Sequence, residues 1–178
     1  MGELEEPKGQ KLLLAAMPEL AEEFPNLRLI FLGQGPDRDK LKTMADSMGL
    51  SGRCEFPGYV QPVEPVIAAS SCVVLPTLSE GFSPAALEAM ALGIPVAASA
   101  TGGLLEMIDS GEDGLLFTPG DLDDLKKAVQ RLLGDDELRR HLGQKARMKV
   151  RREFMAGKMA GDTLEVYREV LNGAGVAD

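Results

Sequence analysis

The sequence contains no tryptophan, and Phe, Tyr and Trp together make up only 4% of its 178 residues. Proteins that bind single-stranded nucleic acid by base stacking need aromatic side chains, so this composition argues against that class. Asp and Glu number 28 against 19 Lys and Arg, which gives a formal net charge of −9. Because such an excess repels a phosphate backbone, we expect no nucleic-acid partner.

Cysteine, histidine and long apolar runs are also scarce. Cys54 and Cys72 lie in apolar surroundings without the spacing of metal ligands, so we interpret them as reduced core thiols rather than as a disulfide or a nucleophile. The only histidine, His141, lies in a polar helical stretch and is interpreted as a solvated residue. No apolar run approaches the roughly 20 residues that span a bilayer. No basic-then-apolar leader opens the chain, so cytoplasm is the expected compartment.

Short apolar runs alternate with longer stretches of helical spacing. The expected strands are 27–32, 54–56, 72–75, 94–98 and 114–117, and the expected helices are 11–24, 37–48, 63–69, 84–92, 104–108, 121–133, 137–152 and 162–171. Short strands that are apolar throughout and separated by helices are typical of a parallel sheet covered on both faces. We therefore predict an α/β fold with a doubly wound, Rossmann-like sheet. It forms one domain over residues 1–171, followed by a frayed tail at 172–178.

Doubly wound sheets bind their ligands beyond the carboxyl ends of the strands. The loops expected there are 33–37, 58–62, 76–83 and 99–103. In the third loop, Ser83 suits a helix N-cap and Pro84 suits the first helical position. Gly81 lets a ligand approach the backbone closely. The free amides at this helix start, with the helix dipole behind them, predict a phosphate or diphosphate site that needs no metal.

Two glutamates flank this predicted anion site. Glu88 lies one turn into a helix whose other residues are apolar, so the helix is expected to be buried nearly all round. Helical side chains lean toward the N-terminus, and its carboxylate would therefore point back to the anion site and suit the vicinal diol of a ribose. The alternative is a surface glutamate on one wet edge. Glu80, just before the helix, either accepts hydrogen bonds from sugar hydroxyls or complements the helix dipole.

The segment 79–91, Ser-Glu-Gly-Phe-Ser-Pro-Ala-Ala-Leu-Glu-Ala-Met-Ala, places seven residues between these two glutamates. It resembles the paired-glutamate signature of GT-B glycosyltransferases of family 4, also called glycosyl transferase group 1. Five further motifs lie before and after this segment, in that family's order over almost the whole chain. They are Leu-Gly-Gln-Gly-Pro at 32–36, Phe-Pro-Gly-Tyr-Val at 56–60, Gly-Ile-Pro-Val at 93–96, Thr-Gly-Gly-Leu-Leu-Glu at 101–106 and Asp-Gly-Leu-Leu-Phe at 113–117. The chain thus resembles the C-terminal, donor-binding domain of the GT-B fold.

The resemblance implies a retaining enzyme that moves a hexose from a UDP-, GDP- or ADP-sugar to an acceptor, with no cofactor and no catalytic metal. It implies that Glu88 holds the ribose hydroxyls and that Glu80 acts on the transferred hexose as the catalytic residue. Lys8 and the amides of Gly81, Phe82 and Ser83 are implied to contact the diphosphate and the sugar. Gly33 and Gly35 are implied to lie beneath the nucleotide. Tyr59 and Val60 are implied to lie beside the base.

The chain also departs from that family. Glu3 stands where the family carries an arginine, and two unit charges roughly 4 Å apart interact by about 1 to 4 kcal/mol, so the reversal removes a diphosphate contact. Ser83 replaces a usual glycine. The strand expected before Gly2 and the acceptor-binding domain are missing, so we expect unpaired strand edges and no activity of the chain alone. The expected partners are a separate acceptor-binding domain or a second copy of the chain. The alternative function is that of a non-catalytic nucleotide-sugar-binding or protein-interaction fragment.

Residues 139–152 hold seven Lys or Arg residues and no acid. We interpret this stretch as a solvated helix face. The alternative is peripheral contact with anionic lipid at the inner face of the membrane.

Overall fold

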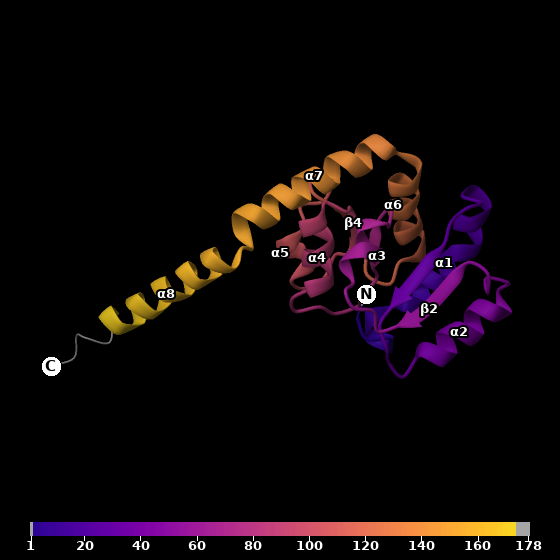
Figure 1. The fold of residues 1–178 in the computed structure, drawn as a ribbon, viewed down its shortest axis with the longest axis horizontal. Coiled ribbons are helices and arrows are strands. Elements are labelled where there is room, and N and C mark those ends of the chain that lie inside the picture. The colour runs from indigo at the N-terminus through magenta and orange to yellow at the C-terminus, as the bar shows by residue number, and fades with distance from the viewer. Residues whose placement is uncertain (1, 174–178) are drawn as a thin grey trace.

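The computed structural model describes residues 2–173, in which strands and helices alternate along the chain (Figure 1). The strands are β1 (Leu29–Leu32), β2 (Cys54–Gly58), β3 (Val73–Leu75), β4 (Val96–Ser99) and β5 (Leu115–Phe117). The helices are η1 (Glu6–Lys8), α1 (Gln10–Glu23), α2 (Arg38–Ser47), α3 (Glu64–Ala68), α4 (Pro84–Leu92), α5 (Leu104–Met107), α6 (Leu122–Gly134), α7 (Asp136–Glu153) and α8 (Ala156–Gly173). Every strand and helix expected from the sequence is present.

All strand pairs are parallel, which confirms the α/β, Rossmann-like class. Strand β1 pairs with β2, and β3, β4 and β5 form a second sheet in that order. Within residues 2–173, no ladder joins β1 to β3. The parallel sheet is therefore divided into two parts, and the unpaired strand edges that the sequence predicts are present at β1 and β3.

Helices cover both parts of the sheet. Helix α1 contacts α2 and α6, and α6 also contacts β4 and β5, whereas α4 contacts α3 and α7 together with β3 and β4. One cluster of buried apolar side chains is centred on α1 and extends to Ala97 of β4 and Phe117 of β5, so it spans both parts of the sheet, and the other is centred on α4. Since the strands are parallel, their carboxyl ends share one edge, and the loops at that edge form the site described below.

Both cysteines are free, as expected from the sequence. Cys54 is buried and Cys72 is half-buried. Burial raises the pKa of each thiol to about 11, which keeps both in the unreactive protonated form at neutral pH.

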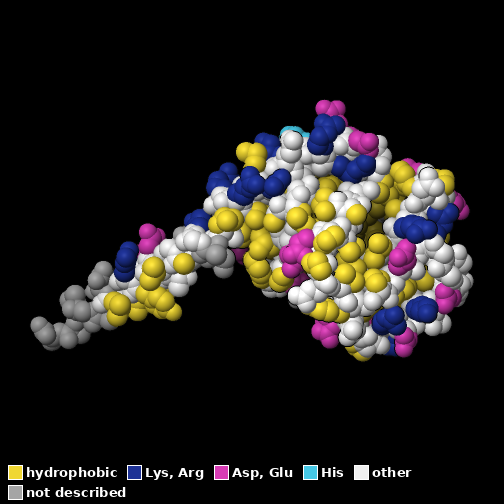
Figure 2. Space-filling model, in the orientation of Figure 1, with side chains coloured by type: hydrophobic (Ala, Val, Ile, Leu, Met, Phe, Trp, Pro, Cys, Tyr) yellow, Lys and Arg dark blue, Asp and Glu magenta, His cyan; other side chains and the backbone are white. Residues whose placement is uncertain are grey.

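Helix α8 continues away from the body of the molecule beyond α7 (Figure 1). It begins before the expected residue 162 and takes in residues 172 and 173 of the expected tail; residues 174–178 lie outside the described residues. Its exposed apolar side chains include Leu164, Tyr167 and Leu171 (Figure 2). No described helix combines the length and the hydropathy that crossing a bilayer requires.

The expectation of a solvated helix face at 139–152 is wrong for Lys149. Most Lys and Arg side chains of α7 gather on its outer side (Figure 2), but the inner side packs against α4, and Lys149 is only 7% exposed. Its Nζ lies 2.8 Å from Oδ2 of Asp109 and 3.1 Å from Oδ2 of the buried Asp113. A buried ammonium is tolerated there because two carboxylates compensate it.

Candidate functional site

A large cavity lies at the carboxyl ends of β1 and β2 and has a volume of about 810 Å³. Its walls come from the N-terminal segment, the loops after β1 and β2, and one residue of α4. They are formed by Gly2, Glu3, Leu32, Gly33, Gln34, Gly35, Tyr59, Val60, Gln61, Pro62, Val63, Glu64 and Glu88. Five residues that the sequence assigns to a donor site, Gly33, Gly35, Tyr59, Val60 and Glu88, therefore share one cavity.

Gly33 and Gly35 make room for polypeptide in this structure. A Cβ atom at Gly33 would lie 1.8 Å from the carbonyl oxygen of Gly2, and one at Gly35 would lie 2.3 Å from that of Leu4. Any side chain would displace the segment 2–4 from the loop after β1. The nucleotide contact expected of the two glycines stays a prediction, and their packing role is an addition that only the coordinates reveal.

Helix α4 begins as the sequence predicts. Ser83 occupies the N-cap, its Oγ accepts a hydrogen bond from the Ala86 N–H at 3.4 Å, and Pro84 takes the first helical position. Within residues 2–173, the N–H groups of Gly81, Phe82 and Ser83 donate no hydrogen bond. Gly81 and Phe82 are exposed, whereas Ser83 is buried. These N–H groups lie at the positive end of the α4 dipole, where backbone donors without a partner favour an anion.

Glu88 is exposed, and α4 is not buried nearly all round as expected. Only Ala86, Ala89 and Met90 are buried, while Leu92 and the small Ala91 also face solvent. The sequence-based argument for a functional Glu88 was that its carboxylate would be costly to bury without a ligand. Because the side chain is exposed, that argument is wrong. The side chain nevertheless lines the large cavity, where a ligand hydroxyl can reach it.

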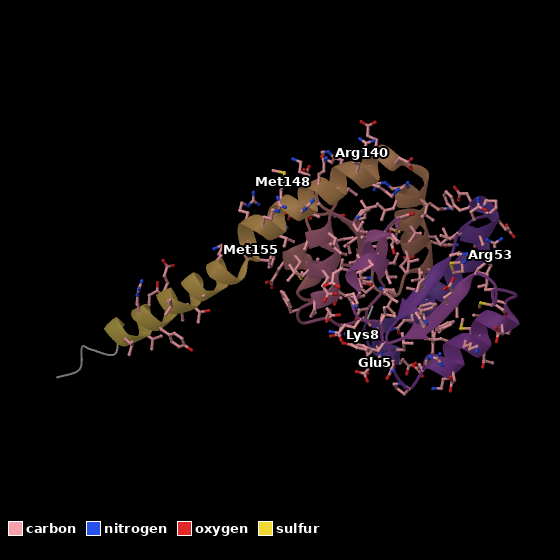
Figure 3. All side chains as sticks on the ribbon, in the orientation of Figure 1. Glu5, Lys8, Arg53, Arg140, Met148 and Met155 are labelled. Carbon is pink, nitrogen blue, oxygen red and sulfur yellow. The ribbon has the colours of Figure 1, made fainter. Side chains whose placement is uncertain are left out.

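Glu80 lies in a second, smaller cavity rather than beside Glu88. Its side chain is 15% exposed, and its Oε2 accepts a hydrogen bond from Lys8 Nζ at 3.1 Å. Lys8, in η1, lies where the two halves of the molecule meet (Figure 3). The small cavity of about 60 Å³ also contacts Ser83, and Leu32 belongs to the walls of both cavities. Lys8, Glu80 and Ser83 thus form one group, adjacent to the group around Glu88.

A pair of glycines that the sequence did not assign to the site supports the Glu80 loop. The Gly103 N–H donates a hydrogen bond to the Glu80 carbonyl at 2.9 Å. A Cβ atom at Gly102 would lie 1.8 Å from the Glu80 carbonyl oxygen, and one at Gly103 would lie 1.9 Å from that of Gly81. The loop 99–103 was expected at the site from its place after a strand, and its two glycines pack against the backbone of the loop that carries Glu80.

Charge differs sharply between the two cavities. Three glutamates, Glu3, Glu64 and Glu88, line the large cavity, and none of its lining residues is Lys or Arg. The small cavity contains Lys8 and opens beside the free amides of the α4 start. Among the described residues, no group of three or more His, Cys, Asp and Glu side chains is placed to hold a metal ion.

The parallel strands flanked by helices, with paired glutamates near the edge where the strands end, match the fold class of GT-B glycosyltransferases. The family model described as glycosyl transferases group 1 matches residues 1–149, and this chain belongs to that family. Among curated proteins, an uncharacterized glycosyltransferase of Methanocaldococcus jannaschii is 32% identical over 170 residues, which cover 94% of this chain and 43% of that protein. The chain spans about half the length of the curated relatives it matches.

Solved structures agree with this assignment. The Anabaena protein HepE in complex with UDP-glucose is 25% identical, with a TM-score of 0.85 over 94% of this chain and 48% of that one. The C-terminal domain of LpcC, a group 1 protein of Francisella tularensis, is similar in fold, with 24% identity, a TM-score of 0.80 and coverage of 88% of this chain and 84% of that chain. This chain therefore shares the fold of that C-terminal domain.

Proposed function

We propose that this chain binds a nucleotide-diphosphate sugar and that it serves as the donor-binding domain of a retaining glycosyltransferase that transfers a hexose. The observation that carries the proposal is the exposed Glu88 carboxylate in a cavity of about 810 Å³, on the same helix whose first amides are free. A ribose in this cavity and a diphosphate at the helix start would be joined within one ligand.

The distribution of charge supports this orientation of the donor. An anionic diphosphate is repelled by the three glutamates of the large cavity, whereas the uncharged base and ribose are not. Ribose hydroxyls donate hydrogen bonds to a carboxylate, so Glu88 would hold them. Tyr59 and Val60 would border the base. The diphosphate would then lie toward the amides of Gly81, Phe82 and Ser83.

Lys8 and Glu80 would act at the transferred hexose. Glu80 would accept hydrogen bonds from sugar hydroxyls at the reacting end of the donor. Lys8, whose Nζ already lies 3.1 Å from Glu80 Oε2, would stabilise the negative charge that develops on the departing diphosphate. The helix start of α4 would contribute to the same stabilisation without movement, because its amides are already oriented.

The relatives support a UDP-sugar or a chemically related donor, since HepE was solved with UDP-glucose. We propose UDP-, GDP- and ADP-sugars as the candidate donors. The acceptor would be bound by polypeptide outside this chain.

The test is saturation-transfer NMR on the folded chain with UDP, GDP and ADP. We expect saturation of the ribose protons for at least one of the three nucleotides. The absence of contact with all three, with folding verified by circular dichroism on the same sample, would contradict the proposal.

A second candidate function is binding of a nucleotide sugar without turnover. Glu3 favours it, because its carboxylate lines the large cavity near the diphosphate path. An assay for hydrolysis of UDP-glucose by the purified chain distinguishes the two candidates. Release of glucose above the rate of a Glu80→Gln variant would exclude the second candidate.

A further inference from the structure

Helix α7 separates its residues into a buried side and an exposed side. The buried side includes Leu142, Ala146 and Val150, and the helix packs against α4 and α6. A Cβ atom at Gly143 would lie 2.0 Å from the carbonyl oxygen of Gly93, the residue that caps α4, so the two backbones are in direct contact. The exposed side therefore belongs to a helix whose position on the body is fixed.

That exposed side is strongly basic, although the whole chain carries a net charge of −9. Helix α7 contains seven Lys or Arg residues and three acids, and the acids lie only in its first and last turns. Figure 2 shows Lys and Arg side chains gathered along the outer side of α7. We call this side the basic face, and its Lys, Arg and Met members are Arg140, Lys145, Arg147, Met148, Arg151 and Arg152.

Most cations of the basic face have no carboxylate partner. Arg152 pairs with Glu153, at the end of the helix. Within residues 2–173, no side-chain ion pair or hydrogen bond involves Arg140, Lys145, Arg147 or Arg151. Cations that lie close together on one rigid surface repel one another, so an anionic partner is favoured there.

An exposed apolar side chain lies among these cations. Met148 is 68% exposed, and Figure 3 shows it on the outer side of α7. Its neighbours three and four positions away on the helix include Lys145, Arg151 and Arg152. A nucleic-acid backbone has no use for an apolar group at this position, whereas the interface of a bilayer accepts one between its headgroups. The mixture of cations and an exposed methionine thus favours a lipid surface over other polyanions.

We propose that the basic face of α7 docks on an anionic lipid bilayer. Met148 inserts at the boundary of headgroups and acyl chains, and the surrounding Lys and Arg side chains contact the lipid anions. Their apolar stems lie along the bilayer while their charged ends remain in water. At 1.5 Å per residue, the face extends about 18 Å from Arg140 to Arg152. Because α7 is already folded and fixed on the body, docking requires no ordering of the chain.

The candidate donor site stays open in this orientation. Figure 3 shows Lys8 on the side of the body away from Arg140 and Met148. A bilayer along α7 therefore leaves the cavity that contains Lys8 and Glu80 accessible. Docking is independent of the proposed function, and it is measured without a nucleotide.

The first measurement is flotation of the full chain with phosphatidylcholine vesicles, with and without about 40% phosphatidylserine. We expect flotation only with phosphatidylserine, and its loss at about 1 M salt, where the Debye length falls to about 3 Å. Lys145→Gln and Arg151→Gln should each weaken binding about fivefold, because each removes one cation from the surface. Lys42→Gln is the matched control. It removes an exposed cation from α2 and should bind as the unsubstituted chain does.

A second measurement reports the depth of insertion. Since the chain contains no tryptophan, Met148→Trp introduces a single fluorescent reporter. We expect its emission to shift to shorter wavelength with anionic vesicles and to be quenched by bromine-labelled acyl chains, because the indole leaves water at the headgroup level. Met48→Trp, at an apolar position that is 37% exposed, is the matched control and should show neither change.

The proposal is overturned if the chain fails to float with the anionic vesicles or floats equally with phosphatidylcholine alone. It is also overturned if Lys42→Gln weakens binding as much as Arg151→Gln does. An unchanged Met148→Trp emission on vesicles that carry the chain would exclude insertion. Binding of duplex RNA through Lys145 and Arg151, without binding to vesicles, would assign the basic face to a nucleic acid instead.

Discussion

Gly103→Ala tests how the Glu80 loop is held in place. Gly103 has φ −62° and ψ −16°, which alanine adopts without strain, so the substitution changes packing alone. The added Cβ would lie 1.9 Å from the Gly81 carbonyl oxygen and 2.9 Å from its carbon. These are backbone atoms, which cannot rotate away as a side chain would, so the loop that carries Glu80 must move.

The cost follows from two contacts. Forcing a methyl group into a packed contact costs about 1 to 3 kcal/mol. Displacement of the loop also weakens the hydrogen bond from Gly103 to Glu80, worth about 0.5 to 1.5 kcal/mol. For a chain of this size, each kcal/mol lowers Tm by about 2 to 4 °C. We therefore expect Gly103→Ala to lower Tm by about 3 to 18 °C in thermal unfolding followed by circular dichroism.

Gly134→Ala is the matched control. A Cβ atom there has no neighbour within 4 Å, and the residue ends helix α6. Because alanine favours helix over glycine by up to about 1 kcal/mol, Tm should stay equal or rise. Equal Tm values for Gly103→Ala and the unsubstituted chain would refute the account of how the loop is supported.

Three further predictions test the site and the surface. Glu88→Gln should weaken UDP binding by about 10- to 100-fold in calorimetric titration, because a hydrogen bond to a charged group is lost. Tm should stay unchanged because the side chain is exposed. Unchanged affinity would exclude Glu88 from the nucleotide site. Lys149→Met leaves the Asp113 carboxylate buried without its cation and should lower the free energy of unfolding by about 3 to 5 kcal/mol in urea; a stable variant would contradict the pairing. If the outer arginines of α7 contact anionic lipid, the chain should sediment with phosphatidylserine vesicles and not with phosphatidylcholine vesicles. Sedimentation with both kinds of vesicle, or with neither, would exclude that alternative.

The same ion pairs set a pH dependence. The hydrogen bond from Lys149 lowers the pKa of Asp109 below its ordinary value of 3.8. This pair therefore stabilises the fold fully above pH 3.8 and is lost as pH falls through the lowered pKa. Burial lowers the pKa of Lys149, but its hydrogen bonds to Asp109 and Asp113 outweigh burial and raise it above 10.5, so the cation remains through the neutral range. In acid denaturation, we expect the unsubstituted chain to lose this stabilisation below pH 3.8, and a Lys149→Met variant to lack that loss.

Local features were predictable from the sequence because they depend on near neighbours. Apolar runs and helical spacing gave strands and helices close to the observed bounds, and Ser83 with Pro84 identified the start of α4. The expectation of separated strand edges also holds. The bounds of the elements and the start of α4 are decided by residues within a few positions of one another, where propensity and capping rules apply. The strand edges were predicted from the family resemblance, which places a strand between them.

Features that depend on distant contacts were not predictable. Lys149 looks like its basic neighbours in the sequence, and its partner Asp109 lies 40 residues away. Glu88 was expected in a buried helix because composition does not tell which side of a short, Ala-rich helix meets other elements. The supporting contacts of Gly103 likewise become visible only when two loops are brought together in space.

The central claim is that the diphosphate of a nucleotide sugar lies on the free amides at the start of α4, with the nucleoside in the neighbouring acidic cavity. The most direct test is titration of the ¹⁵N-labelled chain with UDP, followed by amide chemical shifts. The account predicts that the largest shifts occur at Gly81, Phe82 and Ser83, together with Gly33 and Tyr59 at the large cavity. Saturable shifts confined to α6 and α7, with these five amides unmoved, would contradict it.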